Sequence, residues 1–323
     1  MKKNKIVIWT ALILMLVLAG CRNTENQKAG SSSETTSAVA EPRELKDFLG
    51  NQVSVPATPK RVIGSYLEDY LVALGVTPVA QWSVNDGKSI QNYLEGSLKN
   101  VPTIAHDLPF EAVTSFKPDL LLISSSGTVE GGKYDQYAKI APTYVVENGE
   151  TVNWRDQLIE VGNVLNKKAD AEKVLKEYDE KTKTAKADIK KATAGESAAV
   201  IWVVNNAAFM VSEKTSSGAV LYGELGLKVP NLVKEISEKA TANWSAVSLE
   251  KLAELDADNI FLVNSDRANG AAMLEDAIWK NIPAVKNGRV YEFGPETSWL
   301  YTGPIANGQI IDDVLASLVK KDR

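Results

Sequence analysis

Residues 167–193 read KKADAEKVLKEYDEKTKTAKADIKKAT and contain neither glycine nor proline. Small or apolar side chains recur every three or four residues, at Ala171, Val174, Leu175, Tyr178, Thr182, Ala185, Ile189 and Ala192. This spacing predicts one amphipathic helix, which at 1.5 Å per residue would be about 40 Å long. We interpret it as a rigid rod that joins two separately folded parts of the chain.

Strand-like and helix-like segments alternate on both sides of this rod. Before it, strands are expected at 61–64, 76–81 and 119–124, and helices at 65–74, 110–117 and 134–140. After it, strands are expected at 198–204, 209–212, 260–264 and 289–293, and a closing helix at 305–319. Such alternation is typical of parallel α/β sheets. The fold class is therefore α/β, with Rossmann-like lobes at 43–166 and 194–323 joined by the helix 167–193.

The two lobes share a local sequence pattern. The segment 110–123, FEAVTSFKPDLLLI, aligns with 249–262, LEKLAELDADNIFL, at an offset of 139 residues. Acidic residues match at Glu111 and Glu250, and again at Asp119 and Asp258. We interpret this match as a helix–turn–strand unit that occurs once in each lobe.

The N-terminal region follows the order of an export signal. Lys2, Lys3 and Lys5 precede an apolar run at 6–19, and residues 18–21 read Leu-Ala-Gly-Cys. This run is too short to span a membrane comfortably. The sequence Leu-Ala-Gly-Cys resembles the bacterial lipobox, in which the cysteine becomes lipidated. We therefore predict a signal peptide at 1–20 and a lipid anchor on Cys21. The polar residues 22–41 contribute to a flexible tether, which we place at 21–42.

Composition excludes several classes of function. The chain carries a net charge of −5, which argues against nucleic acid as a partner, and the charge becomes more negative once the signal peptide is removed. Cys21 is the only cysteine and His106 the only histidine, so disulfides and metal sites built on several imidazoles are excluded. We find no Gly-x-Ser-x-Gly, Gly-x-Gly-x-x-Gly or phosphate-loop motif. These absences favour binding over catalysis.

Two kinds of residue could carry binding. Trp82 directly follows a predicted strand, and Trp299 and Tyr301 lie in a turn-rich loop; tryptophans are nevertheless more often core residues. Arg267 follows a later strand in Ser-Asp-Arg-Ala-Asn-Gly, with a solvated loop charge as the alternative.

Glu111 and Glu250 begin equivalent helices. They either interact with the helix dipole or form a two-point electrostatic dock for a partner.

Together these features resemble the iron-siderophore substrate-binding lipoproteins of ATP-driven importers in Gram-positive bacteria. The resemblance covers residues 43–320 and is clearest in KIAPTY from Lys139, AVLYGELGL from Ala219, LEKL from Leu249 and IWKN from Ile278. It implies a non-enzymatic, monomeric binding protein held at the outer face of the cell membrane. It also implies that Glu111 and Glu250 engage the permease subunits.

In this family the ligand lies in a cleft between the lobes, lined by aromatic residues and one or two arginines. By alignment, the residues near it are Tyr66, Trp82, His106, Ser125, Arg267, Trp299 and Tyr301. Hydroxamate-binding relatives often have an arginine where this chain has Ala105 and His106, and some have tryptophan and arginine near Lys214 and Ser216. These departures leave the individual ligand contacts open.

The few arginines and many rings favour a near-neutral ferric hydroxamate. The iron would arrive already chelated, so no cofactor and no protein metal ligand are expected. Alternatives within the same class are ferric catecholate, ferric citrate, haem or a corrinoid. A lipid-anchored α/β hydrolase, which would require His106, and a purely structural lipoprotein are the alternatives of other classes.

Overall fold

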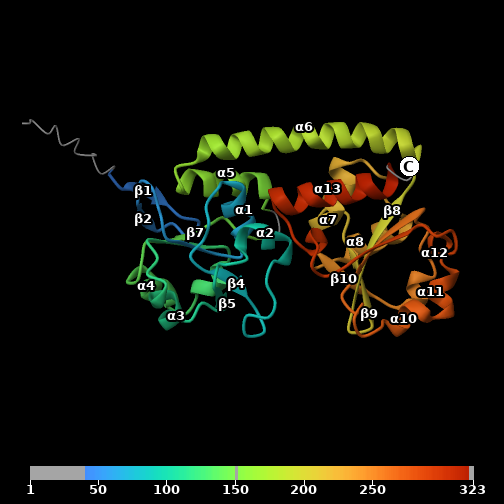
Figure 1. Cartoon of the computed structure of the whole chain (residues 1–323), viewed down its shortest axis with the longest axis horizontal. Coiled ribbons are helices and arrows are strands. Elements are labelled where there is room, and N and C mark those ends of the chain that lie inside the picture. Colours follow the sequence, from blue (N-terminus) through green and yellow to red (C-terminus); the bar gives the residue numbers. More distant parts are fainter. Residues whose placement is uncertain (1–40, 150–151, 320–323) are drawn as a thin grey trace, which may run out of the picture. The chain divides into compact units, whose positions relative to one another are not determined.

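The computed structural model describes residues 41–149 and 152–319. The predicted signal peptide, Cys21 and most of the predicted tether lie outside these ranges. We call the elements from β1 to α5 the N-terminal lobe and those from β8 to α13 the C-terminal lobe (Figure 1). No helix in the described ranges combines the length and apolar character that a membrane span needs.

The N-terminal lobe is built on parallel strands. Its strands are β1 (Arg43–Lys46), β2 (Gln52–Val55), β3 (Val62–Ser65), β4 (Gln81–Ser83), β5 (Thr103–Ala105), β6 (Leu120–Ile123) and β7 (Thr143–Val145). Its helices are α1 (Glu68–Ala73), α2 (Glu95–Leu98), α3 (Phe110–Ser115), α4 (Lys133–Ala138) and α5 (Trp154–Val164), with short turns η1 (Asn92–Leu94) and η2 (Ser126–Val129). The strands β3, β6 and β7 form one parallel sheet in the order β3-β6-β7, and β4 pairs with β5 in parallel. A parallel bridge between Ile63 and Ala80 connects the two groups.

Alternate residues of the N-terminal sheet enter two separate cores. Leu120 and Leu122 pack on the side of α1 and α5, whereas Leu121 and Ile123 pack on the side of α3 and α4. All four side chains are fully buried. A strand that is apolar on both faces is what a parallel sheet covered by helices on both sides requires. Ahead of this sheet, β1 and β2 form an antiparallel hairpin in which Val53 and Val55 are buried.

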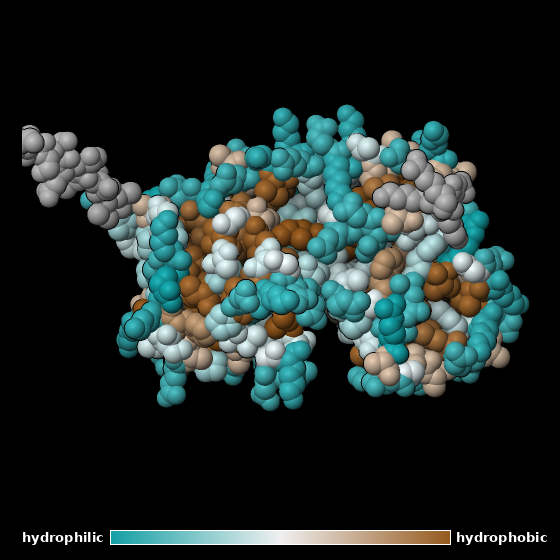
Figure 2. All heavy atoms as spheres, viewed as in Figure 1, coloured by the Kyte–Doolittle hydropathy of each residue, from teal (hydrophilic) through white to brown (hydrophobic). Residues whose placement is uncertain are grey.

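The predicted rod is confirmed as α6 (Lys168–Thr193), a helix of 26 residues. It runs alongside α5 and α13 (Figure 1). Its buried positions are Ala171, Tyr178, Thr182, Ala185, Ile189 and Thr193, which follow the predicted stripe except for Thr193. The opposite face is hydrophilic (Figure 2) and carries exposed pairs such as Lys173–Glu177. The exact boundaries of the predicted domains stay predictions.

The C-terminal lobe has a mixed sheet in the order β10-β9-β8-β11-β12. Its strands are β8 (Ala198–Val204), β9 (Ala207–Val211), β10 (Trp244–Val247), β11 (Asn259–Asn264) and β12 (Val290–Phe293). Its helices are α7 (Ser216–Gly218), the π-helical turn η3 (Ala219–Glu224), α8 (Asn231–Lys239), α9 (Leu249–Leu252), α10 (Ala272–Glu275), α11 (Ala277–Asn281), α12 (Pro283–Lys286), η4 (Ser298–Leu300) and α13 (Pro304–Leu318).

Two strands of this lobe depart from the predicted parallel pattern. β9 and β10 are antiparallel to their neighbours. The reason is the two-residue turn Asn205–Asn206, in which both residues have positive φ angles of 51° and 57°. That conformation folds β8 directly back into β9 as a hairpin, and asparagine adopts it more readily than other non-glycine residues.

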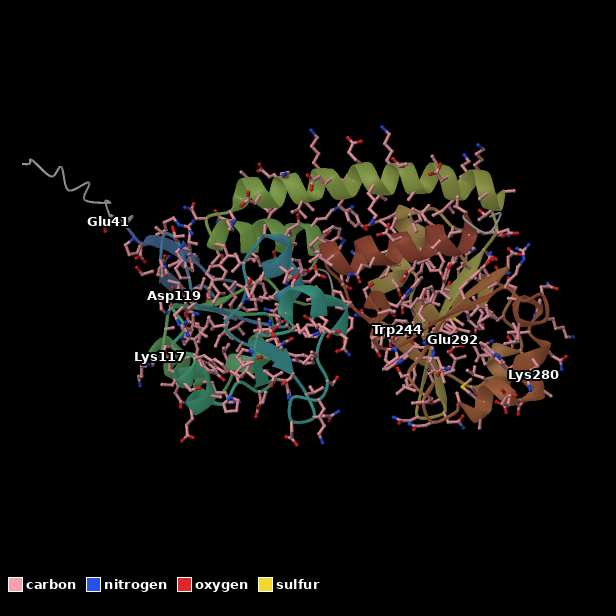
Figure 3. The ribbon with its side chains drawn as sticks, viewed as in Figure 1. Glu41, Lys117, Asp119, Trp244, Lys280 and Glu292 are labelled. Carbon is pink, nitrogen blue, oxygen red and sulfur yellow. The ribbon has the colours of Figure 1, made fainter. Side chains whose placement is uncertain are left out.

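The repeated segment has the same structure in both lobes. α3 precedes β6, and α9 precedes β11. Asp119, which is labelled in Figure 3, accepts hydrogen bonds on its carboxylate from the backbone N–H groups of Lys60 and Arg61, just before β3. Asp258 likewise accepts from the N–H and hydroxyl of Ser197, just before β8. Asp119 and Asp258 therefore have the same structural role, because each connects the starts of two adjacent strands.

Arg155 of α5 links the rod to both lobes. Its guanidinium donates to Asp179 of α6 at 3.0 Å and to Glu224 of η3 at 2.7 Å. The guanidinium also lies over the rings of Trp154 and Tyr178, with its central carbon 4.5 Å and 5.0 Å from their centroids. Partly buried ion pairs reinforced by such ring contacts restrict how the lobes can move about α6.

Gly218 marks a close approach of two backbone segments. A Cβ atom placed there would lie 2.0 Å from the carbonyl oxygen of Ser212, whereas one at Gly223 would have no atom within 4 Å.

We therefore expect Gly218→Ala to lower the free energy of unfolding by about 2 kcal/mol or more, as overpacked sites do. The matched variant Gly223→Ala should leave stability unchanged or slightly improved, because alanine favours a helix. Denaturant melts of both variants measure this difference. Equal midpoints for the two would contradict the close approach.

Candidate functional site

Four rings form a cluster that we call the aromatic cluster: Tyr66, Trp82, Tyr93 and Tyr301. The Tyr66 and Trp82 rings meet edge to face with centroids 4.8 Å apart, and Tyr301 lies 4.9 Å from Tyr93 and 6.3 Å from Tyr66. Tyr301 comes from the C-terminal lobe and the other three from the N-terminal lobe. The structure thus brings together three predicted ligand residues, Tyr66, Trp82 and Tyr301.

Tyr66 is exposed and has a strained backbone. It directly follows β3 and has a φ angle of 58°, a left-handed conformation that is unfavourable for a bulky residue. Its side chain is 42% exposed, although it is a large aromatic residue. Desolvation raises the pKa of its hydroxyl above the usual range, with Tyr301 and Glu68 adding to the effect, so the hydroxyl is neutral. Strain retained at an exposed ring is a sign of function.

Two buried acids lie behind the cluster at the start of α1. Glu68 and Asp69 are 1% and 2% exposed. Glu68 accepts a hydrogen bond from the backbone N–H of Trp82 at 2.7 Å, and its other carboxylate oxygen has no partner among the described residues. Asp69 accepts from the Tyr93 hydroxyl at 2.9 Å. Burial raises the pKa of Glu68 to about 7 and that of Asp69 to about 6, against the lowering effect of these bonds.

His106 and Ser125 lie at the same edge of the N-terminal sheet as Tyr66. Tyr66 follows β3, His106 follows β5 and Ser125 comes two residues after β6. Carboxyl ends of parallel strands meet at one sheet edge, where open α/β sheets bind ligands. Both side chains are exposed, and no described contact joins either of them to the aromatic cluster.

Trp299 requires a correction. We expected it to contact ligand from a turn-rich loop, but it is 0% exposed. Its ring stacks on Phe261 at 4.9 Å and packs on Phe293 at 5.0 Å, while its indole N–H donates to Asp313. The turn η4 folds this ring into the core of the C-terminal lobe, so it is a packing residue in this conformation.

Arg267 is exposed and already paired. It follows β11, and its Nε donates to Glu292 of β12 at 3.2 Å. Because both side chains remain largely solvated, the pair is weak and Arg267 stays available to an anionic group. The structure does not bring it into contact with the aromatic cluster.

A second group of rings, which sequence reasoning missed, lies on the C-terminal sheet. Trp202 is 5.3 Å from Phe209 and 5.9 Å from Trp244, and all three are half-buried. Trp244 lies on the edge strand β10 (Figure 3). Trp202 and Phe209 are opposite each other in the β8–β9 ladder. The Asn-Asn turn was the signal for this pairing, since it sets which residues of the two strands face one another.

A cavity of about 540 Å³ lies beside the start of β10. It is lined by the β9–α7 loop, the end of α8 and the loop before β10, including Glu213, Lys214, Lys234 and Glu238. Next to the β9–α7 loop, Ser216 and Ser217 are buried and their hydroxyls have no partner.

Glu111 and Glu250 are exposed in the first turns of α3 and α9. The Glu250 carboxylate has a lowered pKa because its own backbone N–H and the Ser248 hydroxyl donate to it. Its neighbour Ser248 caps α9 by accepting from the Lys251 N–H. Both acids thus stand free of ion pairs in the described part of the chain, which suits either of the two roles considered from sequence.

Metal and nucleophile chemistry find no support in the described residues. Across 41–149 and 152–319, no group of three or more His, Asp or Glu residues is placed to hold a metal ion. In the same ranges the side chain of His106 makes no hydrogen bond or ion pair with a serine or an acid, as a hydrolytic triad would need.

The sequence is similar to a known protein family and to individual members of it. The sequence profile described as periplasmic binding protein matches residues 64–297. The iron(3+)-hydroxamate-binding protein FhuD of Bacillus subtilis is 32% identical over 317 residues, which cover 96% of each chain.

Solved structures agree. A FhuD fold-family periplasmic binding protein from Bacillus subtilis, described as part of a Fep/Fec-like ferrichrome ABC transporter, superposes with a TM-score of 0.72 at 28% identity, covering 85% of this chain and 100% of that one. Staphylococcus aureus SirA in complex with staphyloferrin B gives 0.68 at 28% identity, with 85% and 98% covered.

The buried Glu68 predicts a pH-dependent stability. Because its pKa is raised from 4.5 to about 7, the folded state holds the proton more tightly than the unfolded chain. The free energy of unfolding therefore falls as pH rises through this window, by up to about 1.4 kcal/mol per pH unit. Glu68→Gln removes this titration and keeps an acceptor for Trp82. Thermal melts from pH 5 to 8 should show the wild type losing stability relative to the variant. A constant difference would contradict the burial of an acid here.

Proposed function

Because this chain belongs to the periplasmic binding protein family, we propose that it captures a ferric siderophore and delivers it to the permease of an ABC importer. The observation that carries the proposal is the aromatic cluster, in which an exposed and strained Tyr66 is held against Trp82 and Tyr301. Relatives named for hydroxamate, ferrichrome or staphyloferrin B binding support the substrate class.

The rings explain how such a ligand would bind. A siderophore surrounds its iron with oxygen atoms, so the protein meets an organic shell rather than a metal ion. Ring surfaces such as those of Tyr66 and Trp82 provide contact area, and hydroxyl or cationic groups fix orientation. In this proposal the iron is cargo, and the chain supplies no metal ligand to it. The chain also needs no cofactor and performs no reaction.

A hydroxamate complex is the cargo that the charges favour. Carboxylate-rich or catecholate complexes carry several negative charges and call for several converging cations. The aromatic cluster instead has the acids Glu68 and Asp69 behind it, and Arg267 is a single cation that makes no described contact with the cluster. Lys214 and Lys234 at the cavity are balanced by Glu213 and Glu238. Ferric catecholate, ferric citrate, haem and corrinoid remain the alternatives to test.

We propose that the protein is located at the outer face of the cell membrane of a Gram-positive bacterium. Relatives named as lipoproteins support this placement, and Cys21 is the proposed site of the lipid anchor. We propose that the protein acts as a monomer, with Glu111 and Glu250 as docking groups for the two permease subunits. One acid in each lobe suits a partner made of two similar halves.

The cargo can be tested with a panel of ferric complexes. We expect quenching of tryptophan fluorescence by ferrioxamine B and ferrichrome, and weaker quenching by staphyloferrin B, ferric citrate and ferric enterobactin. Trp82→Ala and Tyr66→Ala should each weaken hydroxamate binding about ten-fold, or about 1.4 kcal/mol, measured by calorimetry. Phe48→Ala removes another exposed ring, in the β1–β2 turn, and should leave affinity unchanged.

Tight binding of only an anionic complex would overturn the hydroxamate assignment and keep the class. Absence of binding to every ferric complex, by a folded protein, would overturn the proposed function.

Docking can be separated from binding. The double variant Glu111→Ala, Glu250→Ala should keep ligand affinity and lose uptake of labelled ferrioxamine B by cells that have no other binding protein for it. The matched control Glu172→Ala, Glu177→Ala removes two exposed acids of α6 and should transport normally. Loss of affinity in the first variant would instead place these acids in the ligand site or the fold.

A further inference from the structure

Helix α13 takes its N-terminal cap from the other lobe. The first N–H groups of a helix have no partner within the helix, and a side chain just before it usually accepts from them. Here the preceding residue is Gly303, which has no side chain, and Pro304 has no N–H. Asp69 of α1 does this work instead: its carboxylate accepts from the N–H groups of Ile305 and Ala306, both at 2.9 Å.

The loop before α13 is shaped around this carboxylate. Gly303 has a φ angle of 154°, and a Cβ atom placed there would lie 2.5 Å from the Cγ and Oδ1 atoms of Asp69. Any other residue would therefore push the carboxylate away. The absence of a side chain at 303 and the acid at 69 are complementary parts of one contact.

The same carboxylate also holds two members of the aromatic cluster. Tyr93 donates its hydroxyl to Asp69 Oδ2 at 2.9 Å. Tyr301 lies two residues before Gly303, and its ring packs on Tyr93 and Tyr66. Gln309 of α13 adds a bond to the Tyr93 carbonyl at 3.3 Å. The position of Tyr301 in the cluster thus follows from where α13 begins.

In the part of the chain that the structure describes, no ion pair joins Asp69 to a cation. The titratable groups around it are Glu68 and the hydroxyls of Tyr66, Tyr70, Tyr93 and Tyr301, and the first turn of α13 carries no charged residue. Its compensation consists of the two N–H groups at the positive end of α13 and the Tyr93 hydroxyl. The Asp69 carboxylate therefore depends on the start of α13 for two of its three hydrogen bonds.

We propose that Asp69 is a positioning residue, whose carboxylate fixes the start of α13 and thereby sets Tyr301 against Tyr66 and Tyr93 before any ligand arrives. The link from this contact to affinity rests on the proposed function, whereas the contact itself does not. The cluster would then be assembled across two lobes by one side chain that never touches the ligand.

Hydrogen exchange tests the contact without a ligand. Asp69→Ala should speed exchange of the Ile305 and Ala306 amides at least ten-fold, and Gly303→Ala, which displaces the same carboxylate, should do the same. The matched control Ser248→Ala removes a cap within one lobe and should affect only α9. Asp69→Asn keeps one acceptor oxygen and should be intermediate, which guards against misfolding of the alanine variant. Unchanged exchange at α13 in folded variants would overturn the proposal.

A double-mutant cycle tests the positioning. With ferrioxamine B as the probe, Asp69→Ala should weaken binding about as much as Tyr301→Ala, and should add little in the Tyr301→Ala background. Losses that multiply in the double variant would overturn the proposal, because the two residues would then act separately. If the wild type binds no ferric siderophore, the proposed function fails. The NMR shifts of the Tyr301 ring then decide: a change in Asp69→Ala supports positioning, and unchanged shifts overturn it.

Discussion

Two hydrogen bonds to one buried carboxylate join parts of this chain that are 236 and 237 residues apart. Charged hydrogen bonds of this kind are each worth about 1.5–3 kcal/mol, but burying the charge takes back several kcal/mol. The raised pKa of Asp69 shows that burial outweighs the three bonds that favour the ionised form. Burial thus offsets part of what these bonds contribute to stability. The contact also has a geometric role, because these two bonds form only while the start of α13 lies beside α1.

The rod α6 complements this contact from another side. It connects the lobes covalently, and Arg155 and Lys181 tie it to η3 and α13 through Glu224, Asp312 and the Gly308 carbonyl. A helix without interruption resists bending, so movements between the lobes must be small. The aromatic cluster, which takes Tyr301 from one lobe and Tyr66 from the other, depends on this limited freedom. A surface shared in this way is preorganised, so the ligand binding that we propose for it would cost less entropy.

The fold was largely predictable because its signals are local. The stripe on α6 and the apolar runs at β3, β6 and β11 each predict an element from neighbouring residues alone. The site was only partly predictable, because burial depends on partners far along the chain. Trp299 and Tyr301 come from the same loop, yet one ring is covered by Phe261 and Phe293 and the other reaches Tyr93. Trp202 and Trp244 were overlooked because β9 and β10 run antiparallel, which moves those two rings onto one face.

The distance along the chain between Asp69 and α13 has a consequence for how the protein is made. A ribosome completes α1 and α6 long before it reaches Ile305. The Asp69 carboxylate therefore has no bond to the Ile305 N–H until the end of synthesis. Domains form as units while a chain emerges, and contacts between distant segments come last. The N-terminal lobe therefore spends part of synthesis with the acid beside Tyr93 not yet covered by α13.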